Sequence, residues 1–181
     1  GKNKVFNTKT DGYTRLQATF TWVPSELILK DEKIVIIETP KSPKYSEVII
    51  NEVFPFTSGL FPQTDANMNG FAKTNEDEFI ELKNLTNKKL DLSSCRFYIN
   101  ENNEPSFEFP SNTFLGANSY IVVFGNEGKD GKLNLINTGA TIEFTCNEST
   151  IDYTAYPSGK SGDPSWQRKP NLTGFEKHFG S

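Results

Sequence analysis

The sequence predicts an all-β domain built as a sandwich or a barrel. Short runs of alternating or β-branched residues recur along the chain, and clusters of Gly, Asn, Asp, Ser and Pro separate them. Many short strands at near-regular spacing are typical of these two architectures. The chain contains 15 Phe within a hydrophobic fraction of 35%, so we expect a core of few but bulky side chains carried by thin strands.

The expected strands follow one another from residue 13 to residue 156. The first, 13–22, alternates polar with apolar positions, and the second, 33–38, is a β-branched run. The one helix candidate, Ser25 to Asp31, is too short to be stable on its own. The later strands are expected at 48–54, 78–84, 96–99, 107–109, 120–125, 133–136, 140–146 and 151–156.

A stiff linker is expected between Thr39 and Lys44, where two prolines and two lysines alternate with other residues. The segment before it is too short for a sandwich of its own. We therefore expect residues 1–44 to be an N-terminal β extension or the remnant of a preceding domain, and residues 45–181 to be the main domain.

Charge excludes one class of function. The net charge is −4 and basic residues are scattered, which argues against a phosphate-binding stripe and so against nucleic-acid binding by this domain. No apolar stretch approaches the length of a transmembrane segment.

Cys95 and Cys146 both lie in apolar alternating runs. Two buried free thiols and a disulfide between neighbouring strands are both compatible with that pattern.

Several segments occur in an order that points to a known family. They are Val48–Val53 with its Asn-Glu pair, Asp77–Asn84, Leu90–Ser94, Tyr120–Gly125, Leu135–Phe144 and Pro164–Pro170 followed by Phe175 and His178. From Val48 onward the chain resembles a lamin-tail domain of the bacterial kind. It departs from that family at Cys95, where Trp is usual, and at Asn69, where Asp is more frequent.

The resemblance implies an immunoglobulin-like β-sandwich without catalytic activity of its own. Bacterial relatives are typically parts of exported or surface-attached multidomain proteins, some of them beside nucleases or phosphatases. We therefore expect a structural or interaction module, extracellular or at the cell surface, with a protein or polysaccharide partner. A carbohydrate- or polymer-binding module and an accessory domain of a surface nuclease or phosphatase are the alternatives.

A calcium site is predicted in the segment from residue 65 to residue 77. Residues 65–76 match the template D-x-[DN]-x-[DN]-G-x5-E at every constrained position. Calcium binds six to eight oxygens, which alternate side chains and one backbone carbonyl can supply around a sharp turn. The predicted ligands are Asp65, Asn67, Asn69, the carbonyl of Phe71, and Glu76 or Asp77.

The context of this segment differs from an EF-hand. Residues 54–63 contain two prolines and a glycine, so no helix enters the loop. Glu76, Asp77 and Glu78 could each close the coordination sphere, and the family pattern favours Asp77. With two or three carboxylates the affinity should be weak, on the order of 10⁻⁵ to 10⁻³ M. A plain Asn- and Gly-rich turn is the alternative.

Few residues outside this segment are candidates for catalysis or ligand binding. His178 is the single histidine, so a catalytic triad would depend on it, and a docking contact of the C-terminal segment is the favoured interpretation. Glu52, Glu78 and Glu81 could form an acid pair, but alternation places Glu81 on the face opposite Glu78. Solvated strand positions or loop contacts are therefore the favoured interpretation of these carboxylates. Trp166 and Arg168 could pin the C-terminal segment or form a sugar-binding platform.

Overall fold

The computed structural model divides into two compact units, residues 1–40 and 41–181. The structure describes residues 6–10, 13–17, 35–55, 57 and 65–178. In the first unit, three antiparallel strands form one sheet in the order β1 (Phe6–Thr10), β2 (Tyr13–Gln17) and β3 (Val35–Glu38). The helix expected at Ser25–Asp31 lies outside the described residues.

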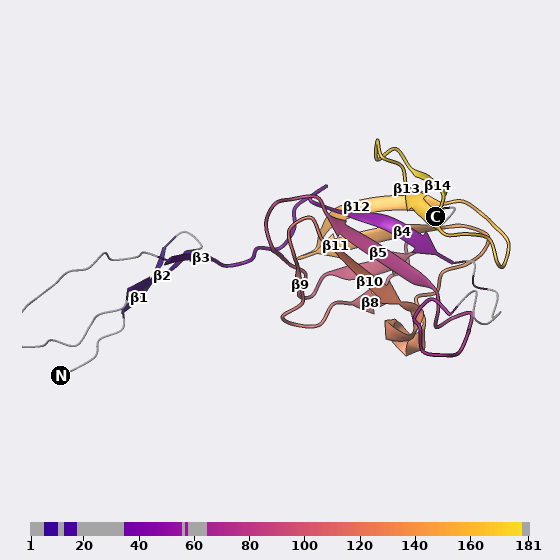
Figure 1. Cartoon of the computed structure of the whole chain (residues 1–181), viewed down its shortest axis with the longest axis horizontal. Coiled ribbons are helices and arrows are strands. Elements are labelled where there is room, and N and C mark those ends of the chain that lie inside the picture. Colours follow the sequence, from indigo (N-terminus) through magenta and orange to yellow (C-terminus); the bar gives the residue numbers. More distant parts are fainter. Residues whose placement is uncertain (1–5, 11–12, 18–34, 56, 58–64, 179–181) are drawn as a thin grey trace, which may run out of the picture. The chain divides into compact units, whose positions relative to one another are not determined.

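The second unit begins at Lys41, which pairs with Leu90 in an isolated bridge and accepts the N–H of Asp91 through its carbonyl at 2.9 Å. Its larger sheet has five strands (Figure 1). In spatial order they are β10 (Tyr120–Phe124), β5 (Phe79–Asn84), β4 (Val48–Phe54), β13 (Trp166–Arg168) and β14 (Phe175–Lys177).

A second sheet of four strands completes the sandwich. Its order is β12 (Ser149–Tyr156), β11 (Ala140–Cys146), β7 (Arg96–Ile99) and β8 (Phe107–Glu108). The remaining elements are the pair β6 (Leu90–Asp91) and β9 (Phe114–Leu115), and two short 3-10 turns, η1 (Gly125–Glu127) and η2 (Lys129–Gly131). Among the described residues, no helix has the length and apolar character needed to cross a membrane.

The core lies between the two sheets. Alternate residues of each strand point inward because side chains on a strand alternate between its faces. Ile80 and Leu82 of β5 and Phe97 and Phe144 of the facing sheet are fully buried and belong to one cluster. Both sheets therefore contribute to a single hydrophobic core, as expected of an immunoglobulin-like sandwich.

One expected strand is absent. Residues 133–136 form no strand, although Leu133 and Leu135 are buried as a strand pattern requires. Asn134 between them has φ 65°, so the backbone turns there and cannot continue an extended ladder. The two leucines reach the core from a loop.

A disulfide joins Cys95, just before β7, to Cys146 at the end of β11. Both residues are almost fully buried, and their Cα atoms lie 4.2 Å apart. Of the two possibilities that the sequence left open, the structure has the disulfide.

A buried ion pair fastens β12 and β13 to β4. A register shift in β4 between Ile50 and Glu52 interrupts its ladder with β5. Ile50 itself pairs with Leu82 in that ladder, and its backbone groups bond to side chains: its N–H donates to Asp152 at 2.8 Å, and its carbonyl accepts Arg168 Nε at 2.9 Å. Arg168 also forms an ion pair with Asp152 and donates to the Thr154 hydroxyl. These bonds hold three strands of two sheets together.

Candidate functional site

The loop that joins β4 to β5 contains the predicted calcium ligands. Because β4 and β5 are antiparallel neighbours, the loop leaves and re-enters the sheet at one end. The structure describes the loop continuously from Asp65 to the start of β5, so all six predicted ligands can be placed.

The first half of the loop is a tight turn wrapped around its own side-chain oxygens. The Asp65 carboxylate accepts the backbone N–H groups of Asn69 and Gly70, each at 3.0 Å. The Oδ1 atom of Asn67 accepts the Asn69 N–H at 3.1 Å, and that of Asn69 accepts the Phe71 N–H at 2.8 Å. Gly70 has φ 89°, a conformation that favours glycine.

Asp77 connects this turn to the second half of the loop. Its side chain is fully buried. One carboxylate oxygen accepts the N–H of Asn67 at 3.2 Å and the other accepts that of Lys73 at 2.6 Å. No Lys, Arg or His side chain within the described ranges forms an ion pair with it. Buried carboxylates usually have a cationic partner or bind a metal, so a cation here would balance the charge.

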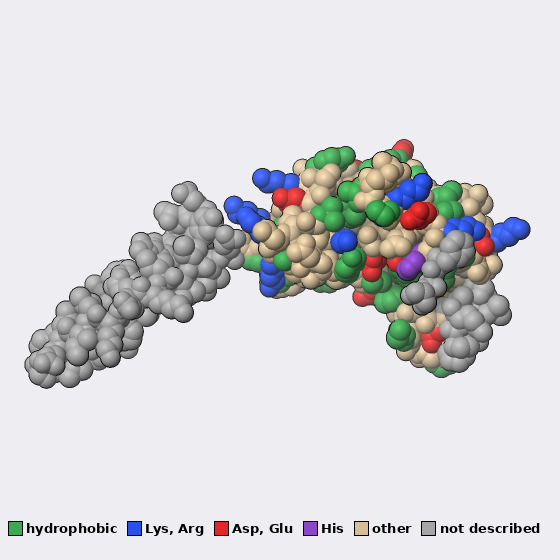
Figure 2. All heavy atoms as spheres, turned by 45° about the horizontal axis from the view of Figure 1, so that its top comes forward, with side chains coloured by type: hydrophobic (Ala, Val, Ile, Leu, Met, Phe, Trp, Pro, Cys, Tyr) green, Lys and Arg blue, Asp and Glu red, His purple; other side chains and the backbone are tan. Residues whose placement is uncertain are grey.

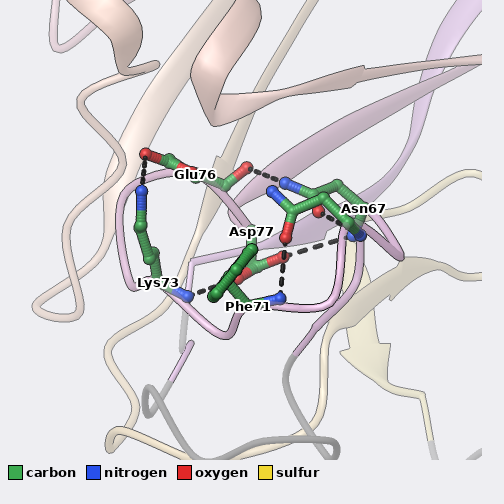
Figure 3. A network of polar contacts seen from close by, with 6 residues as sticks. Asn67, Phe71, Lys73, Glu76 and Asp77 are labelled. Atoms are coloured by element: carbon green, nitrogen blue, oxygen red, sulfur yellow. Dashed lines mark hydrogen bonds and ion pairs between the residues drawn. The ribbon is translucent and has the colours of Figure 1, made fainter.

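Glu76 has a different environment. Its carboxylate forms an ion pair with Lys73 Nζ at 2.8 Å, and its carbonyl accepts the side-chain amide of Asn67 at 3.3 Å. In Figure 3 the Lys73–Glu76 pair lies at one side of the network, Asn67 at the other and Asp77 between them. Asp77 is therefore the candidate whose carboxylate is directed toward the turn.

The donor set suits a hard cation. Carboxylate, amide and carbonyl oxygens are the ligands that calcium prefers, and an sp² oxygen that accepts one N–H retains a second lone pair. In the part of the chain that the structure describes, no three His, Cys, Asp or Glu side chains gather as a metal-binding group. The loop from Asp65 to Asp77 contains three such side chains, Asp65, Glu76 and Asp77, and Glu76 is paired with Lys73. The other candidate oxygens come from asparagines and the backbone.

The fold agrees with the comparison to known families. The Lamin Tail Domain family matches residues 41–163 of the 181. The chain belongs to the lamin tail domain family. This confirms the resemblance to lamin-tail domains, without distinguishing the bacterial kind, and it confirms the immunoglobulin-like sandwich. It assigns the chain to a family of non-catalytic structural or interaction domains. No curated protein matches the chain.

The lamin tail domain holds Trp166 and Arg168, the expected ligand-binding pair, in unlike environments. Trp166 is half-buried and packs against the core. Arg168 is only 9% exposed, and its guanidinium lies over the Phe175 ring, 5.0 Å from the centroid, not over Trp166. Arg168 therefore pins the C-terminal strand from the interior, and only Trp166 of the pair reaches the surface.

His178 docks the C-terminal strand onto β4. Its Nδ1 lies 3.0 Å from a Glu52 carboxylate oxygen, and the Ser165 hydroxyl donates to the same oxygen at 2.5 Å. A catalytic serine needs the imidazole within hydrogen-bond reach, whereas here both side chains bond to the carboxylate.

Glu81, opposite Glu52 in the ladder, accepts the Asn51 side-chain amide at 2.7 Å. Burial raises the pKa of Glu81.

Glu78 is a carboxyl group buried in the domain. It is 6% exposed, and burial raises its pKa to about 8, although the backbone N–H of Leu135 opposes the shift. Its neighbour Tyr156 accepts the Ile136 N–H at 2.9 Å and donates to the Ile136 carbonyl at 3.0 Å. Burial also raises the pKa of Tyr156. Alternation placed Glu78 on the same face as Ile80 and Leu82, but a solvated position or a loop contact was expected for its carboxyl group, and the structure buries it.

We expect the stability of the domain to fall as pH rises from about 4.5 to 8. The Glu78 pKa is 4.5 ordinarily and about 8 in the fold, so in this window the folded chain retains a proton that the unfolded chain has lost. Each pH unit then lowers the free energy of unfolding by up to about 1.4 kcal/mol. Urea unfolding across this range, with a chelator present, measures the slope. Glu78→Gln should flatten it, and an unchanged slope in that variant would contradict the assignment.

Proposed function

We propose that this lamin tail domain is a non-catalytic structural or interaction module of a larger exported protein, stabilised by calcium bound in the loop from Asp65 to Asp77. The observation that carries the calcium proposal is the buried carboxylate of Asp77, which has two N–H donors and no cationic partner within the described residues. Asp65, Asn67, Asn69 and the Phe71 carbonyl supply the other ligands.

An extracellular or cell-surface setting fits both the loop and the disulfide. A site with few carboxylates binds calcium weakly, on the order of 10⁻⁵ to 10⁻³ M, which is useful only where calcium is abundant. The Cys95–Cys146 disulfide supports the same setting, because such bonds form and persist in oxidising compartments.

The distribution of surface charge supports a partner other than nucleic acid. On the face seen in Figure 2, basic and acidic side chains are interspersed and do not gather into one basic patch. Binding to a phosphate backbone requires clustered Lys and Arg. We therefore propose a protein or polysaccharide partner for the module.

Calcium should raise the thermal stability of the domain. Binding to the folded chain alone adds about 2 kcal/mol when free calcium is about twentyfold above Kd, which corresponds to roughly 4–8 °C for a domain of this size. Thermal unfolding with calcium and with a chelator measures the gain. Asp65→Ala should abolish it, because that variant removes a ligand.

Glu76→Gln is the matched control for this experiment. Because Glu76 pairs with Lys73, its loss should leave the calcium response intact, and a lost response would make Glu76 the closing ligand in place of Asp77. Equal melting temperatures with calcium and with chelator in the native chain would contradict the calcium site altogether.

A further inference from the structure

A groove of about 560 Å³ lies on the outer face of the four-stranded sheet, over β7 and β11. Its floor consists of outward side chains of these strands, and its ends are the turns that follow them. The floor includes Arg96, Tyr98, Glu143 and Thr145, and the ends include Glu101 and Glu148. The groove therefore extends along the strands and is unrelated to the calcium loop.

One row of side chains crosses three neighbouring strands, and two of its members, Tyr98 and Glu143, line the groove. The third, Tyr153, lies beside it and donates its hydroxyl to the groove residue Glu101 at 3.4 Å. Glu143 on β11 lies directly opposite Tyr98 on β7 and Tyr153 on β12. Since neighbouring strands are about 4.8 Å apart, the two tyrosines stand roughly 10 Å apart with the carboxylate between them. Tyr153 is 48% exposed. The Thr150 hydroxyl donates to Glu143 at 2.5 Å, which fixes the position of the carboxylate.

The groove has an excess of negative charge. Three carboxylates line it, those of Glu101, Glu143 and Glu148, against the single guanidinium of Arg96. Arg96 in turn pairs with Glu108 at 2.8 Å, so it balances a carboxylate outside the lining set. Within the described residues, no Lys or Arg forms an ion pair with the three, nor do they form a metal-binding group.

We propose that this groove binds an extended, lysine- or arginine-rich segment of a partner protein, with one cationic side chain over Glu143 between Tyr98 and Tyr153. Tyrosine rings attract cations, and the central carboxylate adds charge complementarity that favours basic partners. A second cationic side chain can reach Glu101 or Glu148 at the ends. This inference rests on the proposed interaction role and supplies the chemistry of its partner.

A neutral glycan fits the observations less well. Sugar rings stack on tyrosine faces, but a neutral chain gains no ionic attraction from three uncompensated carboxylates. The groove instead extends along two strands and has a carboxylate at each end. This shape suits an extended peptide, whose side chains on one face recur every second residue.

The test is binding of a fluorescent octapeptide of alternating lysine and serine, followed by anisotropy. We expect saturable binding that weakens as salt is added. Glu143→Gln, which keeps an oxygen for Thr150, should weaken binding about threefold to fivefold. Glu176→Gln makes the same change of charge at an exposed site on β14 and should leave binding unchanged. Glu101→Gln removes a second carboxylate of the groove and is measured in the same way.

Several outcomes would overturn the inference. Equal loss in Glu143→Gln and Glu176→Gln would mean general attraction to an acidic protein. Binding of maltotetraose that disappears in Tyr153→Ala, without binding of the peptide, would identify a glycan site instead. The calcium response is measured on the same samples. If calcium raises the melting temperature but the peptide does not bind, the groove inference is contradicted and the proposed calcium site is not.

Discussion

Replacing Asp152 with alanine is expected to lower the free energy of unfolding by about 3–5 kcal/mol. The side chains of Asp152 and Arg168 are only 16% and 7% exposed. Burial lowers the pKa of Arg168, and the charge of Asp152 opposes that shift. Without Asp152 the guanidinium stays buried with no opposite charge, and the N–H of Ile50 loses its acceptor. Both consequences destabilise the folded chain.

Urea unfolding monitored by circular dichroism measures this effect. Glu104→Ala is the matched control, because it removes an exposed carboxylate that pairs with Lys129 at 3.2 Å. Exposed pairs contribute about 0–1 kcal/mol. A double variant, Asp152→Leu with Arg168→Met, should recover much of the lost stability, since apolar side chains can replace a buried pair. If Asp152→Ala behaved like Glu104→Ala, the buried pair would not be what holds the strands together.

Reduction of the Cys95–Cys146 disulfide is expected to lower the free energy of unfolding by about 4 kcal/mol, because the bond closes a loop of 51 residues. Cross-linking removes conformations from the unfolded chain, and a loop of this length loses many of them. The bond also joins the neighbouring strands β7 and β11, so its loss should loosen the centre of the four-stranded sheet.

Unfolding with and without a phosphine reductant measures the contribution of the disulfide. The double variant Cys95→Ala/Cys146→Ala should unfold near the midpoint of the reduced chain and should not respond to reductant. A native chain whose midpoint does not change on complete reduction, confirmed by thiol titration, would show that the disulfide adds no stability.

Local patterns in the sequence predicted much of the fold. Strands β4, β7 and β11 occur with the expected bounds. In β7 and β11 buried positions alternate, because one face of each strand is buried, whereas the first three residues of β4 are all buried. Strands β13 and β14 were not expected, since each has only three residues. β13 depends on pairing with the distant strand β4, and β14 pairs with β13. The alternating pattern at 133–136 agrees with the burial of Leu133 and Leu135, but the strand that it predicted is absent. Hydrophobic periodicity does not detect the turn at Asn134.

The two candidate sites differ in how far sequence could predict them. The loop from Asp65 to Asp77 is local, so its spacing alone predicted the candidate ligands, of which Asp65, Asn67, Asn69 and Asp77 accept backbone N–H groups of the loop. The row Tyr98, Glu143 and Tyr153 depends on the register of three strands, which no short motif specifies. Likewise, Glu52 and His178 meet across 126 residues, and only the folded topology places them side by side.

A calcium titration of the amide resonances by NMR tests the proposed calcium site residue by residue. We expect saturable shifts at Asn67, Asn69, Gly70, Phe71 and Lys73, whose N–H groups bond to the proposed ligands. Amides elsewhere in the domain should move little. The absence of amide shifts in the loop at millimolar calcium would contradict a calcium site between Asp65 and Asp77. So would amide shifts confined to the residues of the groove on the opposite sheet.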